Sequence, residues 1–289
     1  MSEEVFAGME CGGTSFKCAV GLSDGKILDY TKLDTTTPEE TLSKAVDFFR
    51  QHRIRALAVG SFGPVDTDVS SANYGLIGAT PKLAWRHFNI KDYLQDELNI
   101  SVNVRTDVAV AATGEYWRGS AAGTDRLFYM TIGTGIGGVL LSAGIEDAPK
   151  VQRPIEVGHM RVPDWKSYLE NSIGICPSHG DCLEGLASGP ALEHYRDVVG
   201  GSMDDAAFWD RAAELLAIGI FNISMILQPD KFVLGGGVMQ REGLIEAIRH
   251  KLDNLNSDYI SYPDMDSYLC SSFSEQNGVI GAIKISSQA

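Results

Sequence analysis

The feature that most constrains the fold is a strand, glycine turn, strand pattern that occurs twice. In residues 5–20, the strand-like VFAGME is followed by the turn CGGT and by the strand-like SFKCAV. From residue 127 the same order returns as LFYMTI, GTGIGG and VLLSAG. Because the hairpins lie about half the chain apart, they predict two related halves. We place the division between residues 118 and 119, which gives the lobes 1–118 and 119–289.

Between and after these hairpins, strand-like and helix-like patterns alternate, which is typical of an α/β protein. Short strands are predicted at 56–60, 100–104 and 231–235. Helices are predicted at 38–52, 90–98, 108–117 and 208–227, and a final long helix at 240–255. The stretch 144–182 is irregular and rich in Pro, Gly, His and Cys.

Charge and hydropathy exclude several classes of protein. The net charge of −14 argues against a nucleic-acid partner, since a phosphate backbone is held by clustered Lys and Arg. No apolar run comes near the roughly 20 residues of a membrane helix. The N-terminus shows neither a basic segment nor a cleavage site for export. We therefore expect a cytoplasmic protein that contacts neither nucleic acid nor membrane.

Three glycine-rich turns follow strands, and each is a candidate phosphate site. Glycine lets the backbone approach a phosphate and point N–H groups at it. The turns are Gly12-Gly13-Thr14, the run 133–138 and Gly235-Gly236-Gly237. The alternative is that they are tight turns that require positive φ. The run GTGIGG fits a dinucleotide-binding fingerprint, but a strand follows it where that fingerprint requires a helix, so hydride transfer is not expected.

Asp107 stands where a predicted strand ends and a helix begins. It is a candidate catalytic base, because phosphoryl transfer to a hydroxyl needs a carboxylate that orients the hydroxyl and takes its proton. The alternative is that Asp107 is the N-cap of the helix, a position that Asp favours.

Four residues have the spacing of a zinc site. His159, Cys176, His179 and Cys182 form H-x16-C-x2-H-x2-C, and two thiolates with two imidazoles make a closed tetrahedral site of the structural type. The alternatives are a Cys176–Cys182 disulfide, which a cytoplasmic setting disfavours, and free core cysteines. The zinc would order a loop that also carries Glu156 and Glu184. These carboxylates either bond sugar hydroxyls or are ordinary surface groups.

These segments resemble the ROK family of sugar kinases, most closely its bacterial fructokinase branch. The similar segments run along nearly the whole chain: MECGGT, SFGPVD, ATPKLAWRH, TDVAVAA, TIGTGIGG, EVGH, CPSHGDCLEGLASGPA and LGGGVM. The resemblance implies an α/β chain with the two-lobed actin/hexokinase-like (ribonuclease H-like) ATPase fold and a zinc-bound loop. It also implies a homodimer.

The resemblance further assigns roles to residues of this chain. It implies that Asp107 is the catalytic base, that Glu156 contacts the sugar, and that Gly63 and Pro64 line the sugar pocket. It implies that His159, Cys176, His179 and Cys182 bind zinc, although many relatives have Cys in place of His179. Glu10 is a candidate magnesium ligand through water. The implied nucleotide contacts are Gly12, Gly13, Thr14, Thr134, Gly135, Pro190, Gly235, Gly236, Gly237, Val238 and Met239.

Two positions depart from the family pattern. The first phosphate motif usually reads GGTK, and here Ser15 replaces the Lys, which removes an ammonium near the phosphates. Ala84 stands where the T-P-K-x-G-W pattern has Gly. Neither change removes the expected base or the expected metal ligands.

Together these features predict transfer of the γ-phosphoryl group of ATP, with Mg²⁺, to the 6-hydroxyl of fructose. Two alternatives remain open. One is a ROK kinase for another hexose, such as glucose, mannose or an N-acyl hexosamine. The other is a non-catalytic sugar-binding regulator on the same fold. This alternative stays open because Ser15 stands where the first phosphate motif of the family has Lys.

Overall fold

A computed structural model describes residues 4–142, 150–151, 155–162, 174–199, 202, 205–262 and 264–288. It divides the chain into unit 1, Met1–Gly123 with Phe273–Ala289, and unit 2, Thr124–Ser272. The sequence-based division put all of 119–289 in one lobe. The structure differs at the C-terminus, where helix α10 (Asn277–Ser286) packs on the first strands of the chain.

Unit 1 contains a five-stranded mixed sheet, sheet 1, with the order β3-β2-β1-β4-β5. The pairs β1–β2 and β2–β3 are antiparallel, whereas β1–β4 and β4–β5 are parallel. The strands are β1 (Val5–Cys11), β2 (Ser15–Gly21), β3 (Ile27–Asp34), β4 (Ile54–Ser61) and β5 (Ser101–Thr106).

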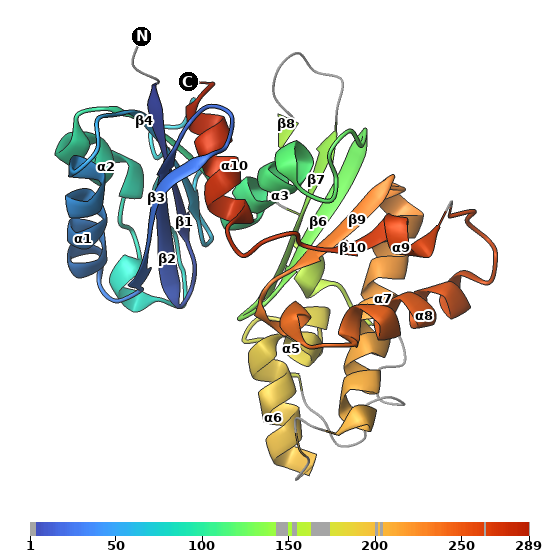
Figure 1. Ribbon diagram of the computed structural model, residues 1–289. Coiled ribbons are helices and arrows are strands. Elements are labelled where there is room, and N and C mark those ends of the chain that lie inside the picture. Colours follow the sequence, from blue (N-terminus) through green and yellow to red (C-terminus); the bar gives the residue numbers. More distant parts are fainter. Residues whose placement is uncertain are drawn as a thin grey trace. The chain divides into compact units, whose positions relative to one another are not determined.

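Helices cover both faces of sheet 1 (Figure 1). Helices α1 (Pro38–Arg50) and α2 (Ile90–Leu98) cover one face, and α3 (Asp107–Arg118) and α10 cover the other. Alternation along β1 makes this possible, because Ala7, Met9 and Cys11 join the core under α1 and α2. Phe6 instead packs with α10. A short 3₁₀ helix, η1 (Leu83–Trp85), adds the buried Trp85 to the core under α1 and α2.

Glycines allow α3 and α10 to approach each other closely. A Cβ on Gly114 would overlap the carbonyl oxygen of Asn277, and a Cβ on Gly281 would overlap that of Val110. The two helices therefore form one backbone-to-backbone contact, which holds the C-terminal segment in unit 1.

Unit 2 repeats the topology of unit 1. Its sheet, sheet 2, has the order β10-β9-β6-β7-β8, with antiparallel pairs β6–β7 and β7–β8 and parallel pairs β6–β9 and β9–β10. Read from β8, this is the order and direction of sheet 1, so the expectation of two related halves is met in the strands. The strands are β6 (Arg126–Ile132), β7 (Ile136–Ser142), β8 (Lys150–Val151), β9 (Lys231–Gly235) and β10 (Leu269–Ser271).

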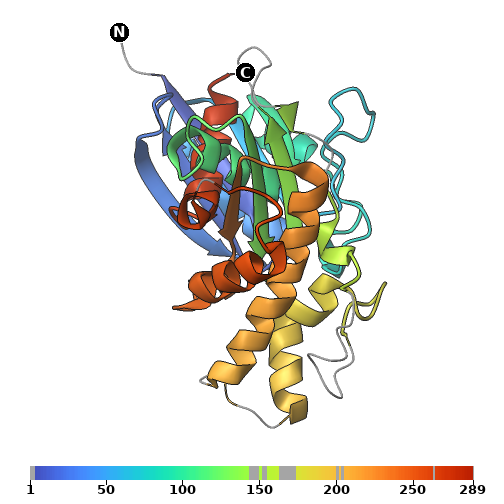
Figure 2. The ribbon, with the colours of Figure 1, turned by 90° about the vertical axis from the view of Figure 1, so that its right-hand side faces the viewer.

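One core joins sheet 2 to the helices of unit 2. Helix α7 (Ala206–Leu227) packs against α8 (Leu244–Asn256), as Figure 2 shows. The shorter helices are α5 (Leu183–Ala187), α6 (Gly189–Val199) and α9 (Met265–Tyr268), with 3₁₀ turns η2 (Val157–His159) and η3 (Gly237–Gln240). The helix expected at 240–255 thus begins at Leu244, and it is not the last helix, since α10 follows it.

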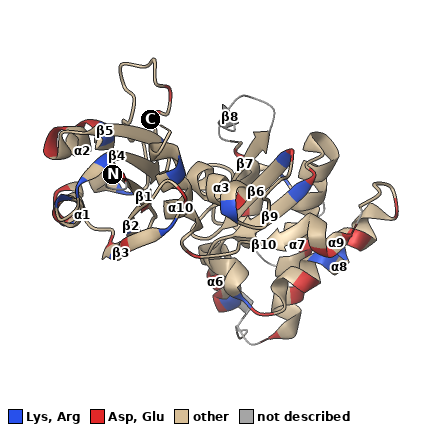
Figure 3. Cartoon of the chain, turned by 45° about the horizontal axis from the view of Figure 1, so that its top comes forward, with Lys and Arg blue, Asp and Glu red and all other residues tan. Residues whose placement is uncertain are grey.

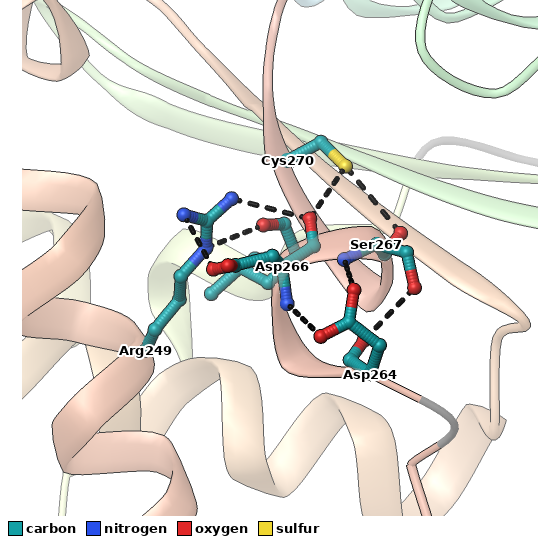
Figure 4. Close-up of polar contacts among 6 residues, drawn as sticks. Arg249, Asp264, Asp266, Ser267 and Cys270 are labelled. Carbon is teal, nitrogen blue, oxygen red and sulfur yellow. Dashed lines mark hydrogen bonds and ion pairs between the residues drawn. The ribbon is translucent and has the colours of Figure 1, made fainter.

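Polar contacts fix the edge strand β10 (Figure 4). Asp264 caps α9 by accepting hydrogen bonds from Asp266 N and Ser267 N. Arg249 of α8 pairs with Asp266 at 2.9 Å and donates to Leu269 O. The Cys270 thiol donates to the carbonyl oxygens of Asp266 and Ser267. These bonds hold the start of β10 against α8.

In the view of Figure 3, Lys and Arg are interspersed with Asp and Glu over both units. In the part of the chain that the structure describes, no helix combines the length and hydropathy that a membrane crossing requires.

Candidate functional site

The carboxyl edge of sheet 1 brings three predicted segments of unit 1 to the same level. Cys11 of β1 pairs with Ser61 of β4, and Ser61 pairs with Thr106 of β5. The next residues along the chain are therefore neighbours at that edge: the first glycine turn after β1, the loop with Gly63 and Pro64 after β4, and Asp107 after β5. This is the edge at which open α/β sheets bind ligands.

Asp107 is the first residue of α3 and not its N-cap. The cap is Thr106, whose side chain accepts a hydrogen bond from Ala109 N. The interpretation of Asp107 as the cap was therefore wrong. Asp107 Oδ1 accepts from Val108 N at 2.9 Å, and its side chain is half-buried. Loss of solvent around the carboxylate raises the pKa of Asp107 to about 7, although the Val108 bond acts in the opposite direction.

The first glycine turn is closed by the backbone and presents a hydroxyl. Gly12 N donates to Ser15 O at 3.0 Å, and Thr35 Oγ1 donates to Gly12 O at 2.9 Å. Thr14 at the tip is exposed. Among the described residues of the three turns, positive φ occurs at Gly236. The alternative that the glycines serve positive φ therefore applies to Gly236 and not to the first two turns.

Glu10 lies one residue before the carboxyl end of β1, directly opposite Lys17 of β2. Lys17 Nζ contacts Glu10 Oε2 at 3.2 Å and donates to Glu275 O at 2.8 Å. Burial raises the pKa of Glu10 in spite of the neighbouring ammonium. Among the described contacts of Glu10, Lys17 donates to Oε2. The second carboxylate oxygen, Oε1, can accept a hydrogen bond from a metal-bound water.

Sequence reasoning missed Lys17. The signal was available, because residues 15 and 17 of a strand point to the same face. Ser15 replaces the expected Lys, and an ammonium is nevertheless present two positions further along that face.

In unit 2, the second and third glycine turns lie side by side with the start of α6. Thr131 of β6 pairs with Gly235 of β9, so the two turns leave sheet 2 together. Gly189 N donates to Gly133 O at 2.8 Å. A Cβ on Gly189 would lie 3.7 Å from Val238. The structure thus brings together the predicted nucleotide contacts of this unit: Thr134, Gly135, Pro190, Gly235, Gly236, Gly237, Val238 and Met239.

Two details of these turns favour a ligand. Thr134 is exposed, and a Cβ on Gly133 or Gly237 would meet nothing within 4 Å. These two glycines are therefore not required by the packing around them. Strand β7 begins at Ile136, inside the glycine run 133–138, which fits the expectation that this is not a dinucleotide-binding helix start.

Glu184 is tied to the second glycine turn. It lies in the first turn of α5, and its Oε2 accepts a hydrogen bond from Ile136 N at 2.9 Å. A Cβ on Gly135 would lie 2.6 Å from the same oxygen. Glu184 is therefore not an ordinary surface carboxylate. Glu156 is exposed beside η2, with no capping bond from its side chain.

The four predicted zinc ligands form one cluster. The ligand atoms of His159, Cys176, His179 and Cys182 all lie within 4.8 Å of one another. His159 Nδ1 is 3.7 Å from Cys176 Sγ and 3.6 Å from Cys182 Sγ. Tetrahedral zinc with its usual bond lengths would separate a sulfur and a nitrogen ligand by about 3.6 Å. The donor set and its spacing therefore fit zinc.

Backbone bonds hold the cluster together. Gly180 N donates to Cys176 O at 2.9 Å, and Leu183 N donates to Met160 O at 3.0 Å. Both cysteines are buried and free, so the structure contradicts a Cys176–Cys182 disulfide. His159 is half-buried and His179 is exposed.

Comparison with known proteins matches residues 6–289 to the ROK family. A fructokinase of Lactococcus lactis subsp. cremoris is 36% identical, over 94% of this chain and 93% of the relative. A fructokinase of Pediococcus pentosaceus is 35% identical, over 97% of each chain. Among solved structures, a ROK family glucokinase from Streptomyces griseus in complex with glucose and AMPPNP superposes with a TM-score of 0.77. It is 25% identical and covers 99% of this chain and 100% of the other.

Proposed function

The chain belongs to the ROK family, and we propose that it transfers the γ-phosphoryl group of ATP to the 6-hydroxyl of fructose. The main support for phosphoryl transfer is the pairing of Cys11 with Ser61 and of Ser61 with Thr106. Because of this register, the first glycine turn and Asp107 lie at the same edge of sheet 1. The choice of fructose is supported by the relatives described as fructokinases, at 35–36% identity over nearly the whole chain.

Asp107 is the proposed catalytic base. An ionised carboxylate accepts a hydrogen bond from the 6-hydroxyl, which aligns the oxygen, and takes its proton as the bond to phosphorus forms. A pKa of about 7 suits this task, because the group is substantially ionised near neutral pH and still basic enough to hold the proton.

The glycine turns are the proposed phosphate contacts. Gly13 and Thr14 in unit 1 and Thr134 and Gly135 in unit 2 are the proposed sources of N–H and hydroxyl donors. The N–H of Gly12 closes the first turn on Ser15 O, so Gly12 is proposed to lie against the phosphates through its backbone. Val238 and Met239 lie on the turn proposed to contact the nucleotide. Magnesium, when bound, supplies positive charge that offsets the phosphates. Of this chain's residues, Glu10 is proposed to hold it through water, and Lys17 to keep that carboxylate in place.

The proposed sugar contacts are Gly63, Pro64, Glu156 and Glu184, together with Asp107. Glu184 lies two residues after Cys182, and Glu156 lies three residues before His159. Zinc held by His159, Cys176, His179 and Cys182 would therefore set the positions of both carboxylates, a structural role without a chemical step.

The pH dependence of the reaction should report Asp107. We expect kcat/KM for the sugar to fall about tenfold for each pH unit below about 7, and to level off above it, because the raised pKa leaves the base protonated on the acid side. The measurement is the initial rate with limiting fructose between about pH 5.5 and 9. A flat profile between about pH 6 and 8 would contradict the assignment of Asp107 as the base with this pKa.

A sugar panel tests the substrate. With ATP and Mg²⁺ in excess, we expect kcat/KM for fructose to exceed that for glucose, mannose and N-acetylmannosamine by about 10-fold or more, the discrimination that a few pocket contacts provide. A preference for glucose would favour the alternative of another ROK hexose kinase. Sugar binding by calorimetry without ATP turnover on any sugar would favour a non-catalytic regulator.

A further inference from the structure

The chain passes between its two units twice, after Gly123 and after Ser272. The residues of unit 1 next to these crossings are 119–123 and 273–277. Both segments lie against α3, the helix that begins with Asp107. One side chain of α3, Glu115, contacts both of them. Glu115 is eight residues after Asp107, about two helical turns, and it is fully buried.

The two oxygens of Glu115 divide between the crossings. Oε2 accepts a hydrogen bond from Ser120 N, in the segment before the first crossing, at 3.1 Å. Oε1 accepts from Phe273 N, directly after the second crossing, at 3.0 Å and from Asn277 Nδ2, at the start of α10, at 3.3 Å. A Cβ on Gly119 would overlap Glu115 Oε2 and crowd the ring of Phe273. The carboxylate thus occupies a closely fitted position between the two segments.

This arrangement requires a carboxylate. A buried carboxylate is costly unless its oxygens are hydrogen-bonded, and here three N–H groups satisfy them. A glutamine of the same size has one oxygen and one NH₂ group. The glutamine oxygen could accept a hydrogen bond from the N–H of either Ser120 or Phe273. Its NH₂ group would then face the other N–H, and two donors cannot bond each other. Glutamine at this position therefore tests the two-sided contact without changing the volume.

We propose that Glu115 is a positioning residue that fastens both crossings to the helix of Asp107. Any reorientation of one unit must proceed through backbone torsions at these two crossings, because they are the only covalent connections between the units. By restricting those torsions, Glu115 keeps the chain in the conformations that carry out phosphoryl transfer. This functional part rests on the proposed kinase activity, whereas the contact itself does not.

The contact is tested by hydrogen–deuterium exchange of the whole protein. In Glu115→Gln, the amides in peptides covering 119–123 and 272–277 should exchange at least about 10-fold faster, the effect of about one lost hydrogen bond to a charged group. Peptides from β4 should not change. Thr113→Val is the matched control, because Thr113 is also buried on α3 and, among the described residues, its hydroxyl donates within the helix, to Ala109 O. It should leave both crossings protected.

The positioning role is tested by kinetics on the same variants. We expect kcat/KM of Glu115→Gln to fall about 10-fold as the competent conformation becomes less populated. The pH midpoint near 7 should stay in place, because Asp107 itself is untouched. Thr113→Val should keep kcat/KM within about twofold. A loss of stability alone would shift the melting temperature without changing rates measured well below it.

If amide exchange in Glu115→Gln is unchanged beside both crossings, the contact is overturned. If exchange is faster but kcat/KM is normal, the positioning role is overturned. A native protein that phosphorylates no sugar would sink the proposed function, and with it the positioning role, while the exchange data would still decide the contact. Should Glu115→Gln fail to fold, Gly119→Ala replaces it, since its methyl displaces the carboxylate from Ser120 and Phe273.

Discussion

Asp107→Asn should lower kcat for fructose phosphorylation by at least about 100-fold, the range expected for loss of a general base. Asparagine keeps the size of the side chain and can still accept the bond from Val108 N, but it cannot take a proton. The effect should appear in kcat more than in KM, because the proton moves only in the transition state.

The same substitution should not weaken the fold at pH 8. The folded-state pKa of Asp107 is raised to about 7 from an ordinary value of 3.8, so the native protein binds this proton more tightly than the unfolded chain. The stabilisation from that proton is present at acid pH and is lost as pH rises through about 7. Above that pH the native state holds an ionised carboxylate at a cost, which asparagine removes. The urea midpoint of Asp107→Asn at pH 8 should therefore equal or exceed that of the native protein.

Asp92→Asn is the matched control, because Asp92 is also a carboxylate in the first turn of a unit 1 helix, α2, and it is exposed. Its kcat should stay within about twofold of the native value. Turnover of Asp107→Asn within about threefold of the native rate would refute the assigned base.

Cys182→Ser should remove the metal and produce the largest loss of stability among these variants. The native protein, purified without chelator, should contain about one zinc per chain by elemental analysis, and the variant less than about a tenth of that. Loss of about 3 kcal/mol of metal-linked stability would lower the melting temperature by roughly 6–12 °C in a protein of this size. The physical reason is that Cys176, His159 and His179 are then left without the ion proposed to hold the loop.

Two variants sharpen this test. Cys270→Ser removes a thiol outside the cluster, and serine can keep the bonds to Asp266 O and Ser267 O, so metal content should not change. His179→Cys should retain zinc, because a thiolate can replace an imidazole in a tetrahedral site. Native protein with no zinc would count against the site, and loss of zinc in Cys270→Ser would show that the loss is not specific to the cluster.

Much of the site was predictable because its signals are local. The turns follow strands of seven residues in both hairpins, and the position of Asp107 at the end of a strand follows from a few neighbouring residues. The spacing of Cys176, His179 and Cys182 confines three ligands to one short loop. In each case, the hydrophobic periodicity and the turn residues that make the prediction lie within fewer than about ten residues of one another, the range in which sequence patterns are informative.

Other features were not predictable in this way. The cap of α3 is Thr106 and not Asp107, and sequence alone does not choose between adjacent residues that both favour a cap. For Glu184 the sequence left a sugar contact and an ordinary surface carboxylate as alternatives, and it gave no sign that packing brings Ile136 N, 48 residues away, to the Glu184 carboxylate. Helix α10 was missed because its buried, glycine-containing sequence lacks a clear polar face.

The sequence by itself determined the two hairpins, the glycine turns, the metal-ligand spacing and the strand end that carries Asp107, since each depends on residues close together in the chain. Only the tertiary structure decided that α10 returns to unit 1, that Lys17 reaches Glu275, and that Glu115 bonds Phe273, 158 residues away. Contacts of this kind depend on the close packing of α3 and α10 through Gly114 and Gly281, and no local period in the sequence encodes which distant surface a helix will meet.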